Sequence, residues 1–415
     1  MLRLLRDNPP LRRFFVAFFG SQVGTGAAYV ALLLVAYQRL HSGWAISLVL
    51  LGEFVPGILL APLFGSFADR FSRRRLVVCA DLMRALCFVA IAVVPSFAAT
   101  VVFALLAGVG TALFRPAINA ALPGLVPAER RSELTAIFYA SINTGLMLGP
   151  AVAAGLLLIT TAPAVLVLNA VSFVVSAVLL AGVDLGPWKT ASGAESAGPP
   201  DPEPASVWAQ TREGARAAVA MPGVAVLMTV GALVVLTGAM FNVLAPLFAT
   251  GPLHADGSGY SVLMALYGLG MVAGSWTNAR AGSDIGGLRR RWLVGIGVSG
   301  VAMAVAALAP NLPLALVAFT FIGLGENLLV GPEMRLMQEM VAERMLGRVF
   351  GLKDVLENIA FVAAFVGAGA LLTVAGVRAV FAGAGVVTVA LAFVGAVAFR
   401  TRRVVAARPA LETGE

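Results

Sequence analysis

The sequence predicts an all-α polytopic membrane protein with twelve transmembrane helices. Hydrophobic residues make up 60% of its 415 residues and the mean hydropathy is +0.93, whereas a soluble domain is about half apolar. Apolar runs of about 20 residues, the length that crosses a bilayer, recur along the chain. Backbone groups in lipid must be satisfied within each segment, and barrel strands would be shorter and alternating, so these runs are expected to be helices.

The apolar runs fall into two sets of six. The first six spans are expected at approximately 14–38, 44–68, 76–95, 98–118, 133–159 and 163–183. The second six are expected at approximately 223–249, 259–279, 291–309, 313–335, 347–373 and 377–399.

The arginines predict the orientation of these spans. With both termini in the cytoplasm, the inner loops and tails collect nearly all of the arginines, and the outer turns keep only Arg39 and Arg378. This asymmetry is the positive-inside rule. The net charge of +8 therefore reflects topology and indicates no nucleic-acid partner. Only two of the 29 basic residues are lysine, which suggests a GC-rich bacterial genome. We expect a multi-pass protein of the bacterial cytoplasmic (inner) membrane.

A polar segment divides the chain into domains. Residues 185–222 interrupt the apolar pattern with Pro199, Pro200, Pro202 and Pro204 among glycine, serine, aspartate and glutamate, which is typical of a flexible linker. The N-terminal six-helix bundle is expected at 1–184, the C-terminal bundle at 223–400 and a cytoplasmic tail at 401–415. Within the linker, residues 207–220 are mildly amphipathic and form either a helix along the membrane surface or a plain solvated helix.

The two halves resemble each other in sequence. Arg115-Pro116 in the fourth span corresponds to Gly331-Pro332 in the tenth, and Asp69 corresponds approximately to Asp284. Repeats of the same orientation imply a pseudo-two-fold axis along the membrane normal, with a cavity between the halves.

A cluster of charge separates the second and third spans. Only 12% of the residues are charged, yet five of them fall between Asp69 and Arg75. Such a cluster must lie outside the lipid, as a tight loop between two helices. The simplest interpretation is topological, because arginines hold a loop on the inner side.

Several motifs resemble those of the major facilitator superfamily of transporters, along nearly the whole chain. The loop signature between spans 2 and 3 matches Gly65, Asp69, Arg70, Arg73 and Arg74, with Ser72 in place of the usual glycine. Gly145, Gly149 and Pro150 in the fifth span partly match the signature of drug–proton antiporters. Other segments are similar to the branch of macrolide-efflux and enterobactin-export proteins. The antiporters' basic residue early in span 4 has no counterpart near Ala104.

The resemblance implies roles for both motifs. Asp69 would accept hydrogen bonds at the start of span 11, near Gly347 and Arg348, and so latch the cytoplasmic gate in the outward-open state. The alternative is the purely topological role of the arginines. Gly145 and Gly149 permit close helix approach, and Pro150 removes a helix hydrogen bond, so span 5 either bends during coupling or packs in the ordinary way.

Acidic residues inside the apolar spans are the main candidates for coupling. An acid at mid-membrane costs about 2.5–3.5 kcal/mol on insertion scales, so each one needs a partner, a water-filled cavity or a proton. Glu53 lies about 14 Å deep, nine residues after Trp44, and Glu326 lies in span 10. Both spans line the cavity in the family that the chain resembles. Either residue could exchange protons or attract a cationic substrate, and the structural alternative for Glu53 is an ion pair with Arg84.

Other charged residues are expected to give structural support. Asp81 and Arg84 lie three residues apart, on one helix face, and should form an ion pair. Arg115 either snorkels to the membrane surface or binds Glu129 or Glu133. Polar residues that could face the cavity, or else form helix–helix hydrogen bonds, are Gln22, Tyr29, Asn143, Asn242, Tyr267 and Asn327.

These features predict a secondary-active exporter of hydrophobic or amphipathic small molecules such as drugs, with protons as the coupling ion. The alternatives are an exporter of one physiological substrate, such as a siderophore or a lysolipid, and a membrane sensor or scaffold that does not transport. An enzyme is not expected, because the sequence carries no Walker loop, metal-ligand cluster or nucleophile elbow. No cofactor, metal or nucleic acid is expected, and the protein is expected to be a monomer.

Overall fold

Long helices make up the described part of the chain. The computed structural model describes residues 8–127, 130–183, 221–255, 257–282, 284–341 and 343–401. Within these residues the regular elements are twelve α-helices and one short 3-10 helix. Ten of the helices are long and apolar enough, over described residues, to cross a membrane. Nearly all of the predicted linker (185–222) and tail (401–415) lies outside the described residues.

Each predicted span coincides with one helix, which confirms the all-α fold. The largest difference in a boundary is six residues, at the start of α11, predicted at 291 and found at Ile285. The first elements are α2 Pro9–Leu40, α3 Gly43–Arg70, α4 Arg73–Val93, α5 Phe97–Ala121, η1 Leu122–Gly124, α6 Arg131–Leu157 and α7 Ala162–Ala181. The others are α9 Pro222–Thr250, α10 Gly257–Arg280, α11 Ile285–Leu308, α12 Leu312–Met340, α13 Glu343–Val374 and α14 Val377–Thr401.

Capping residues set several helix ends. The Oδ1 atom of Asn8 accepts a hydrogen bond from the amide of Leu11 at 3.2 Å, and Pro9 and Pro10 occupy the first turn of α2, where no amide donor is needed. His41 ends the same helix in the left-handed conformation, with φ of 51°. Ser42 then caps α3, so a single pair of residues separates two spans.

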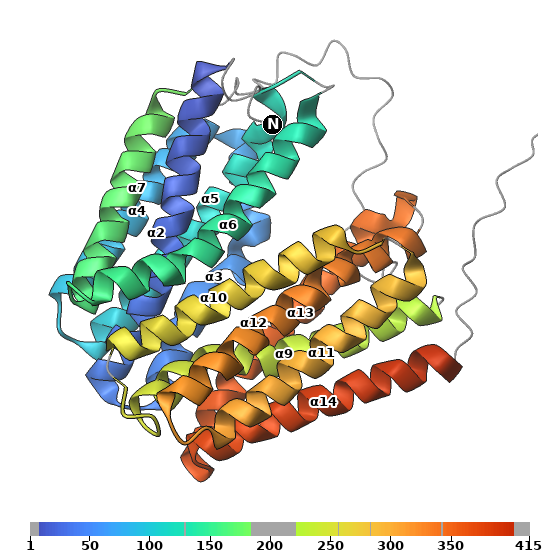
Figure 1. The fold of residues 1–415 in the computed structure, drawn as a ribbon. Coiled ribbons are helices and arrows are strands. Elements are labelled where there is room, and N and C mark those ends of the chain that lie inside the picture. The colour runs from blue at the N-terminus through green and yellow to red at the C-terminus, as the bar shows by residue number, and fades with distance from the viewer. Residues whose placement is uncertain are drawn as a thin grey trace, which may run out of the picture. The chain divides into compact units, whose positions relative to one another are not determined.

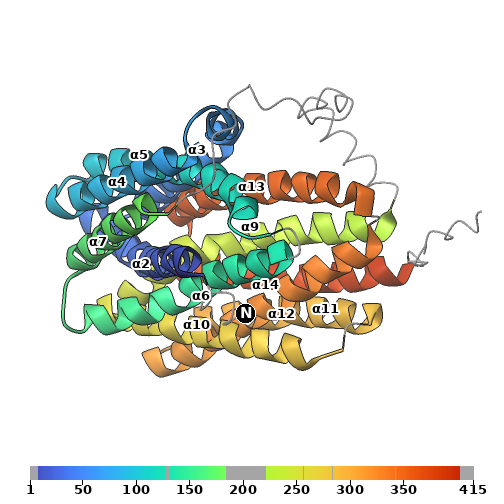
Figure 2. The ribbon, with the colours of Figure 1, turned by 90° about the horizontal axis from the view of Figure 1, so that it is seen from above.

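The chain divides into two compact units. Unit 1 comprises Met1–Ala197, Ala245–Gly268 and Ala368–Leu372, and unit 2 comprises Gly198–Leu244, Leu269–Gly367 and Thr373–Glu415. The six-plus-six division of the sequence stays a prediction. In unit 1, α2 packs against α6 and α7, and α4 packs between α5 and α7 (Figure 1 and Figure 2). In unit 2, α11 packs against α12 and α14 (Figure 1).

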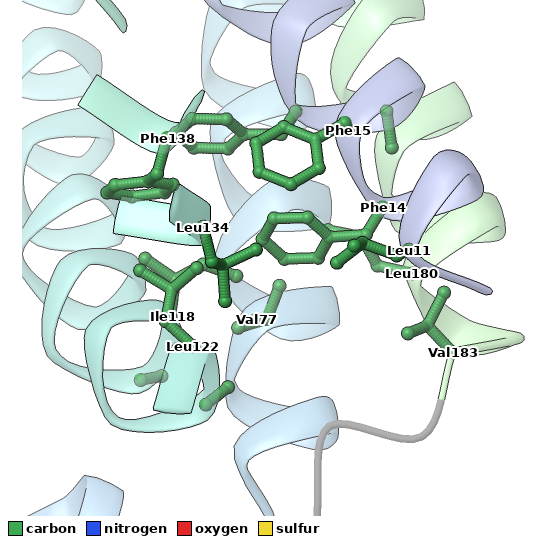
Figure 3. Close-up of a cluster of buried hydrophobic side chains, with 14 of the residues drawn as sticks. Leu11, Phe14, Phe15, Val77, Ile118, Leu122, Leu134, Phe138, Leu180 and Val183 are labelled. Atoms are coloured by element: carbon green, nitrogen blue, oxygen red, sulfur yellow. The ribbon is translucent and has the colours of Figure 1, made fainter. Parts of the chain in front are cut away.

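Aromatic side chains fill one end of the helix bundle in unit 1. Phe14 and Phe15 of α2 lie against Ile118 of α5 and Phe138 of α6, and all four are buried (Figure 3). The rings of Phe18 and Phe138 stack with their centroids 4.6 Å apart. Because such rings bury a large apolar area, this cluster joins five helices into one rigid end.

The two arginines that the sequence predicts in outer turns bind helix ends. Arg39 donates to the carbonyl oxygen of Ile91 at 2.6 Å, at the C-terminal end of α4. Arg378 donates to the carbonyl oxygens of Ala307 and Ala309 at 2.8 and 2.9 Å, at the C-terminal end of α11. The last carbonyls of a helix have no partner within it and carry partial negative charge. This binding is a physical reason for two arginines on the side where the sequence predicts almost no others.

Candidate transport site

Glu53 lies in the middle of α3 and is half-buried. The backbone at this depth packs directly against α5. A Cβ atom placed on Gly108 would lie 2.6 Å from the carbonyl oxygens of both Gly52 and Glu53. The two helices therefore touch through their backbones. This contact fixes the position of the Glu53 backbone, from which the carboxylate side chain extends.

Tyr29 links this glutamate to a second tyrosine in unit 1. Tyr29 of α2 is within electrostatic range of both Glu53 and Tyr260, and Tyr260 at the start of α10 is buried. A phenol can donate a hydrogen bond to a carboxylate or accept one from a carboxylic acid. At electrostatic range, Tyr29 influences the charge state of Glu53. The structure brings Glu53 and Tyr29, both predicted from the sequence, into electrostatic range and adds Tyr260 beside Tyr29. In the sequence, Tyr260 at the edge of a span looks like an ordinary aromatic residue of the membrane interface.

Glu326 is, like Glu53, a half-buried acid inside a long apolar helix, and it lies on α12 of unit 2. Its Oε1 atom lies 3.7 Å from where a Cβ atom on Gly238 of α9 would be. Seven residues further along α12, Glu333 is buried, and its Oε1 atom lies 2.9 Å from a Cβ atom placed on Gly231. The seven-residue spacing recurs on α9, so a glycine makes room for each carboxylate on one face of α12.

A buried ionic cluster surrounds Glu333. Its Oε2 atom accepts a hydrogen bond from the indole Nε1 of Trp292 at 3.1 Å. Its Oε1 atom lies 3.3 Å from the Nζ of Lys353, which also pairs with Glu357. The cluster joins α11, α12 and α13, and its central pair of Glu333 and Lys353 is largely removed from solvent.

Sequence reasoning missed this cluster although a signal was present. Lys353, Asp354 and Glu357 all fall early in the predicted span 347–373, and charges inside a span indicate function or pairing. Because these residues lie near the first residues of the span, a position in water at the membrane surface is equally consistent with the sequence. Only the packing of α12 against α13 shows that Glu333 and Lys353 are buried together.

Asp81 and Arg84 form an ion pair inside unit 1. The guanidinium of Arg84 also lies over the rings of Phe114 and Phe173, 4.4 and 4.3 Å from their centroids. Arg84 is therefore held by α4, α5 and α7 together, away from the pairing with Glu53 that the sequence left open. An arginine between two rings gains cation–π attraction, which suits a structural role.

Arg115 is exposed near the end of α5. Glu133, one of the two partners considered for it, forms an ion pair with Arg130 at 2.9 Å, and Glu129 lies outside the described residues. The exposed guanidinium fits snorkelling to the membrane surface.

The charged segment between the second and third spans is mostly helical. Helix α3 continues to Arg70 and α4 begins at Arg73, so only Phe71 and Ser72 lie between them. The predicted loop is therefore shorter than expected, because the onset of charge marks the membrane surface and not the end of a helix. Arg73 is half-buried and Arg74 is exposed. The side chains of Asp69 and Arg70 and the packing at Gly65 lie outside the described part of the structure, so the latch stays a proposal.

Asp284 corresponds to Asp69 in sequence and caps its own helix. Its Oδ2 atom accepts a hydrogen bond from the amide of Gly287 at 2.8 Å, at the start of α11. A carboxylate there is favoured by the helix dipole.

The glycines of the antiporter-like motif pack against α2. A Cβ atom on Gly149 would lie 2.4 Å from the Cα atom of Gly26, and one on Gly145 would lie 2.5 Å from the Cβ of Gln22. Pro150 is buried inside α6. The close approach therefore lies within unit 1, between α6 and α2.

We expect Gly149→Ala to destabilise the protein and to reduce transport. The added methyl group has no space against the α2 backbone, so the helices must separate, and such overpacking typically costs about 1–3 kcal/mol. Gly155→Ala on the same helix is the matched control, since a Cβ atom there meets nothing within 4 Å. Thermal unfolding in detergent measures both variants. Equal unfolding temperatures would show that α6 and α2 are not in close contact.

The remaining polar candidates have different surroundings. Gln22 is half-buried at the contact with Gly145. The Nδ2 of Asn242 donates to the carbonyl oxygen of Ala239 at 3.2 Å, within its own helix. Tyr267 is half-buried in α10. The carbonyl oxygen of Asn327 accepts from the Nδ2 of Asn278 at 2.8 Å, and the side chain of Asn143 lies outside the described part.

Long helices with charged residues buried among them define a polytopic helical membrane protein, and solved transporter structures share its fold. A bacterial homologue of the human lysosomal transporter Spinster, solved in an inward-facing and unoccupied conformation, aligns with a TM-score of 0.66 at 15% identity, over 95% of this chain and 96% of that one. The nucleoside transporter NupG aligns with a TM-score of 0.71 at 14% identity, over 94% of this chain and all of that one.

The chain belongs to the Major Facilitator Superfamily, whose sequence profile matches residues 14–233 and 227–414. It is therefore a membrane transporter and not an enzyme. Macrolide efflux protein A of Streptococcus pyogenes is 22% identical over 361 residues, 84% of this chain and 86% of the relative. The enterobactin exporter EntS of Escherichia coli is 30% identical over 167 residues, 38% of this chain and 39% of the relative.

Proposed function

We propose that this transporter is a secondary-active exporter that exchanges hydrophobic or amphipathic small molecules for protons by alternating access. The observation that carries the proposal is Glu53, a half-buried carboxyl group in an apolar helix with Tyr29 in electrostatic range. Intramembrane acids mark proton and substrate pathways. Glu326 supplies a second such group in unit 2.

The surroundings of these acids support the proposed substrate class. Glu53 stands in an apolar helix with Tyr29 in electrostatic range, and apolar surfaces with a few polar groups suit ligands that are largely hydrophobic. The relatives named as macrolide efflux proteins support the same class. In this proposal the arginine-rich loops and both termini face the cytoplasm, which labelling of single cysteines from either side of the membrane would measure.

A second candidate is export of one physiological substrate such as a siderophore. The similarity to the enterobactin exporter, which covers 38% of this chain, favours it. The two candidates differ in breadth: a drug exporter transports several unrelated amphipathic compounds, whereas a specific exporter transports one.

Transport in proteoliposomes tests the proposal. We expect vesicles with an acidic lumen to accumulate tetraphenylphosphonium several-fold above vesicles without a pH gradient, because protons leaving the lumen drive the probe inward. A permanent cation is used because weak bases collect in an acidic lumen without a carrier. Potassium and valinomycin hold the membrane potential at zero, and protein-free vesicles give the background. Accumulation that is equal with and without the gradient refutes proton antiport. If tetraphenylphosphonium and erythromycin both stay at background while a siderophore is transported, the second candidate holds.

A further inference from the structure

A cavity opens between α10, α11 and α12 in unit 2, where α10 ends and α11 begins. Its volume is about 220 Å³, far more than a single water needs. The cavity lies beside the charged turn between α10 and α11, and Arg291 and Arg335 line it together with Asn278 and Asn327. Arg291, Arg335 and Asn278 are not among the candidates for the proton or substrate pathway, whereas Asn327 is one of the polar residues that could face the transport cavity.

Two polar atoms of this lining are buried without a hydrogen-bond partner among the described residues. Asn278 uses its Nδ2 to bind the carbonyl oxygen of Asn327, which leaves its Oδ1 unpaired. Arg291 uses one terminal nitrogen to bind the carbonyl oxygen of Gly282, which leaves its Nε unpaired. A buried polar atom without a partner costs about 1–3 kcal/mol. A ligand that accepts from Arg291 and donates to Asn278 would satisfy both atoms.

Glycine at position 331 keeps this lining accessible. A Cβ atom there would lie 3.1 Å from the Nδ2 of Asn278, so a larger side chain would crowd the amide and fill the cavity. The corresponding residue of the first half is Arg115.

The charge around the cavity favours an anion. The nearby acids have other partners or face solvent. Asp284 caps α11 and Glu333 binds Trp292 and Lys353, whereas Glu339 is exposed one turn beyond Arg335. Arginine binds phosphate through several donors held in a plane, so two arginines at one cavity indicate a phosphate group.

The surface beside the cavity is apolar and exposed. Trp276 is 59% exposed on α10, and Arg280 lies 3.5 Å above its ring. Val330 and Met334 of α12 are 58% and 44% exposed. Tryptophan and arginine together are typical of the membrane interface, and apolar side chains beyond them contact acyl chains. An anion attached to a hydrophobic tail fits both the cavity and this surface.

We propose that this cavity binds the headgroup of an anionic phospholipid, with its phosphate on Arg291 and Arg335 and a headgroup hydroxyl donating to the Oδ1 of Asn278. Basic pockets between transmembrane helices bind anionic headgroups in this way. The site is independent of the transported substrate, because two arginines repel the cationic probes that suit Glu53. A soluble phosphate ester shares the headgroup chemistry but lacks the tail that the apolar surface would contact.

Native mass spectrometry of the purified full chain tests this site, by titration with phosphatidylglycerol and, separately, with phosphatidylcholine. We expect the parent to bind phosphatidylglycerol at least tenfold more tightly than phosphatidylcholine. Arg291→Gln/Arg335→Gln should weaken phosphatidylglycerol binding at least tenfold, whereas Arg75→Gln/Arg400→Gln, with the same change in charge at exposed positions, should leave it within twofold. Equal binding of the two lipids by the parent, or equal losses in the two double variants, overturns the proposal.

Two further measurements separate the parts of the proposal. Arg335→Gln alone changes an exposed residue and leaves the fold intact, so it should still weaken binding several-fold. Asn278→Leu should remove the preference for phosphatidylglycerol over phosphatidic acid, which lacks the headgroup hydroxyl, and an unchanged preference refutes the role of Asn278. Glycerol 3-phosphate should compete only at concentrations at least a hundredfold above those of the lipid. Competition at equal concentration would assign the cavity to a soluble phosphate ester and overturn the lipid.

Discussion

Replacement of Glu53 by glutamine is expected to reduce accumulation driven by the pH gradient at least tenfold in proteoliposomes. Glutamine keeps the shape and hydrogen-bonding capacity of the protonated acid but exchanges no proton. A half-buried carboxyl group beside Tyr29 is the group through which substrate movement is coupled to proton movement in the proposed function. The variant should still equilibrate substrate downhill, because alternating access itself does not require that the group ionise.

The control for this variant is Glu133→Gln. Glu133 pairs with Arg130 at the partly exposed start of α6, so the same chemical change there should leave transport within twofold. Glu326→Gln, measured alongside, shows whether unit 2 takes part in coupling. Parental gradient-driven accumulation in both Glu53→Gln and Glu326→Gln would overturn the site.

If Glu53 attracts the substrate and does not exchange protons, Glu53→Gln is expected to give a different result. If the carboxylate attracts a cation, Glu53→Gln weakens binding of tetraphenylphosphonium and leaves binding of a neutral amphipathic probe unchanged. If the group carries only protons, the affinities for both probes stay the same and only the response to the gradient is lost. Equilibrium binding to the purified protein therefore separates the two roles.

The second large effect is expected from Lys353→Met. Lys353 and Glu333 have side chains that are 13% and 7% exposed, and the lysine is the cation that lies between Glu333 and Glu357. Removal of one partner of a buried pair typically costs about 3–5 kcal/mol, because the other charge stays buried. We expect a correspondingly large fall in the free energy of unfolding, measured by denaturation in mixed micelles.

Two comparisons make this prediction specific. Arg130→Met breaks a partly exposed pair and should cost less than about 1 kcal/mol. Glu333→Gln combined with Lys353→Met removes both charges of the pair and should recover much of the lost stability, since an uncharged pair carries a smaller desolvation cost. A Lys353→Met variant as stable as Arg130→Met would show that the cluster is solvated.

Much of the fold could be predicted because the bilayer constrains it so strongly. A segment that crosses lipid must be apolar, helical and about 20 residues long, so composition alone predicts each span. Helix ends were less predictable, as at the two-residue turn of Phe71 and Ser72, since a helix can continue past the membrane surface into water. Polar composition cannot distinguish a charged loop from a charged helix end.

The candidate site was only partly predictable. Glu53 and Glu326 could be identified because an acid in an apolar run requires explanation wherever it lies. Glu333 and Lys353 could not, because their burial depends on which helices pack together. Tyr260 could not be assigned either, since an aromatic residue at the edge of a span usually marks the membrane interface.

The sequence by itself determined that this protein is a helical membrane transporter, where its spans lie and which acids are unusual, because these follow from local composition and from short motifs. The tertiary structure alone decided that Gly149 packs on Gly26, that Arg84 is held by two rings and that Trp292, Glu333 and Lys353 form one buried cluster. It also placed Arg291 and Arg335 around one cavity. The reason is physical. Contacts between helices depend on the rotation and depth of each helix, and these are determined jointly by many residues that lie far apart in the chain.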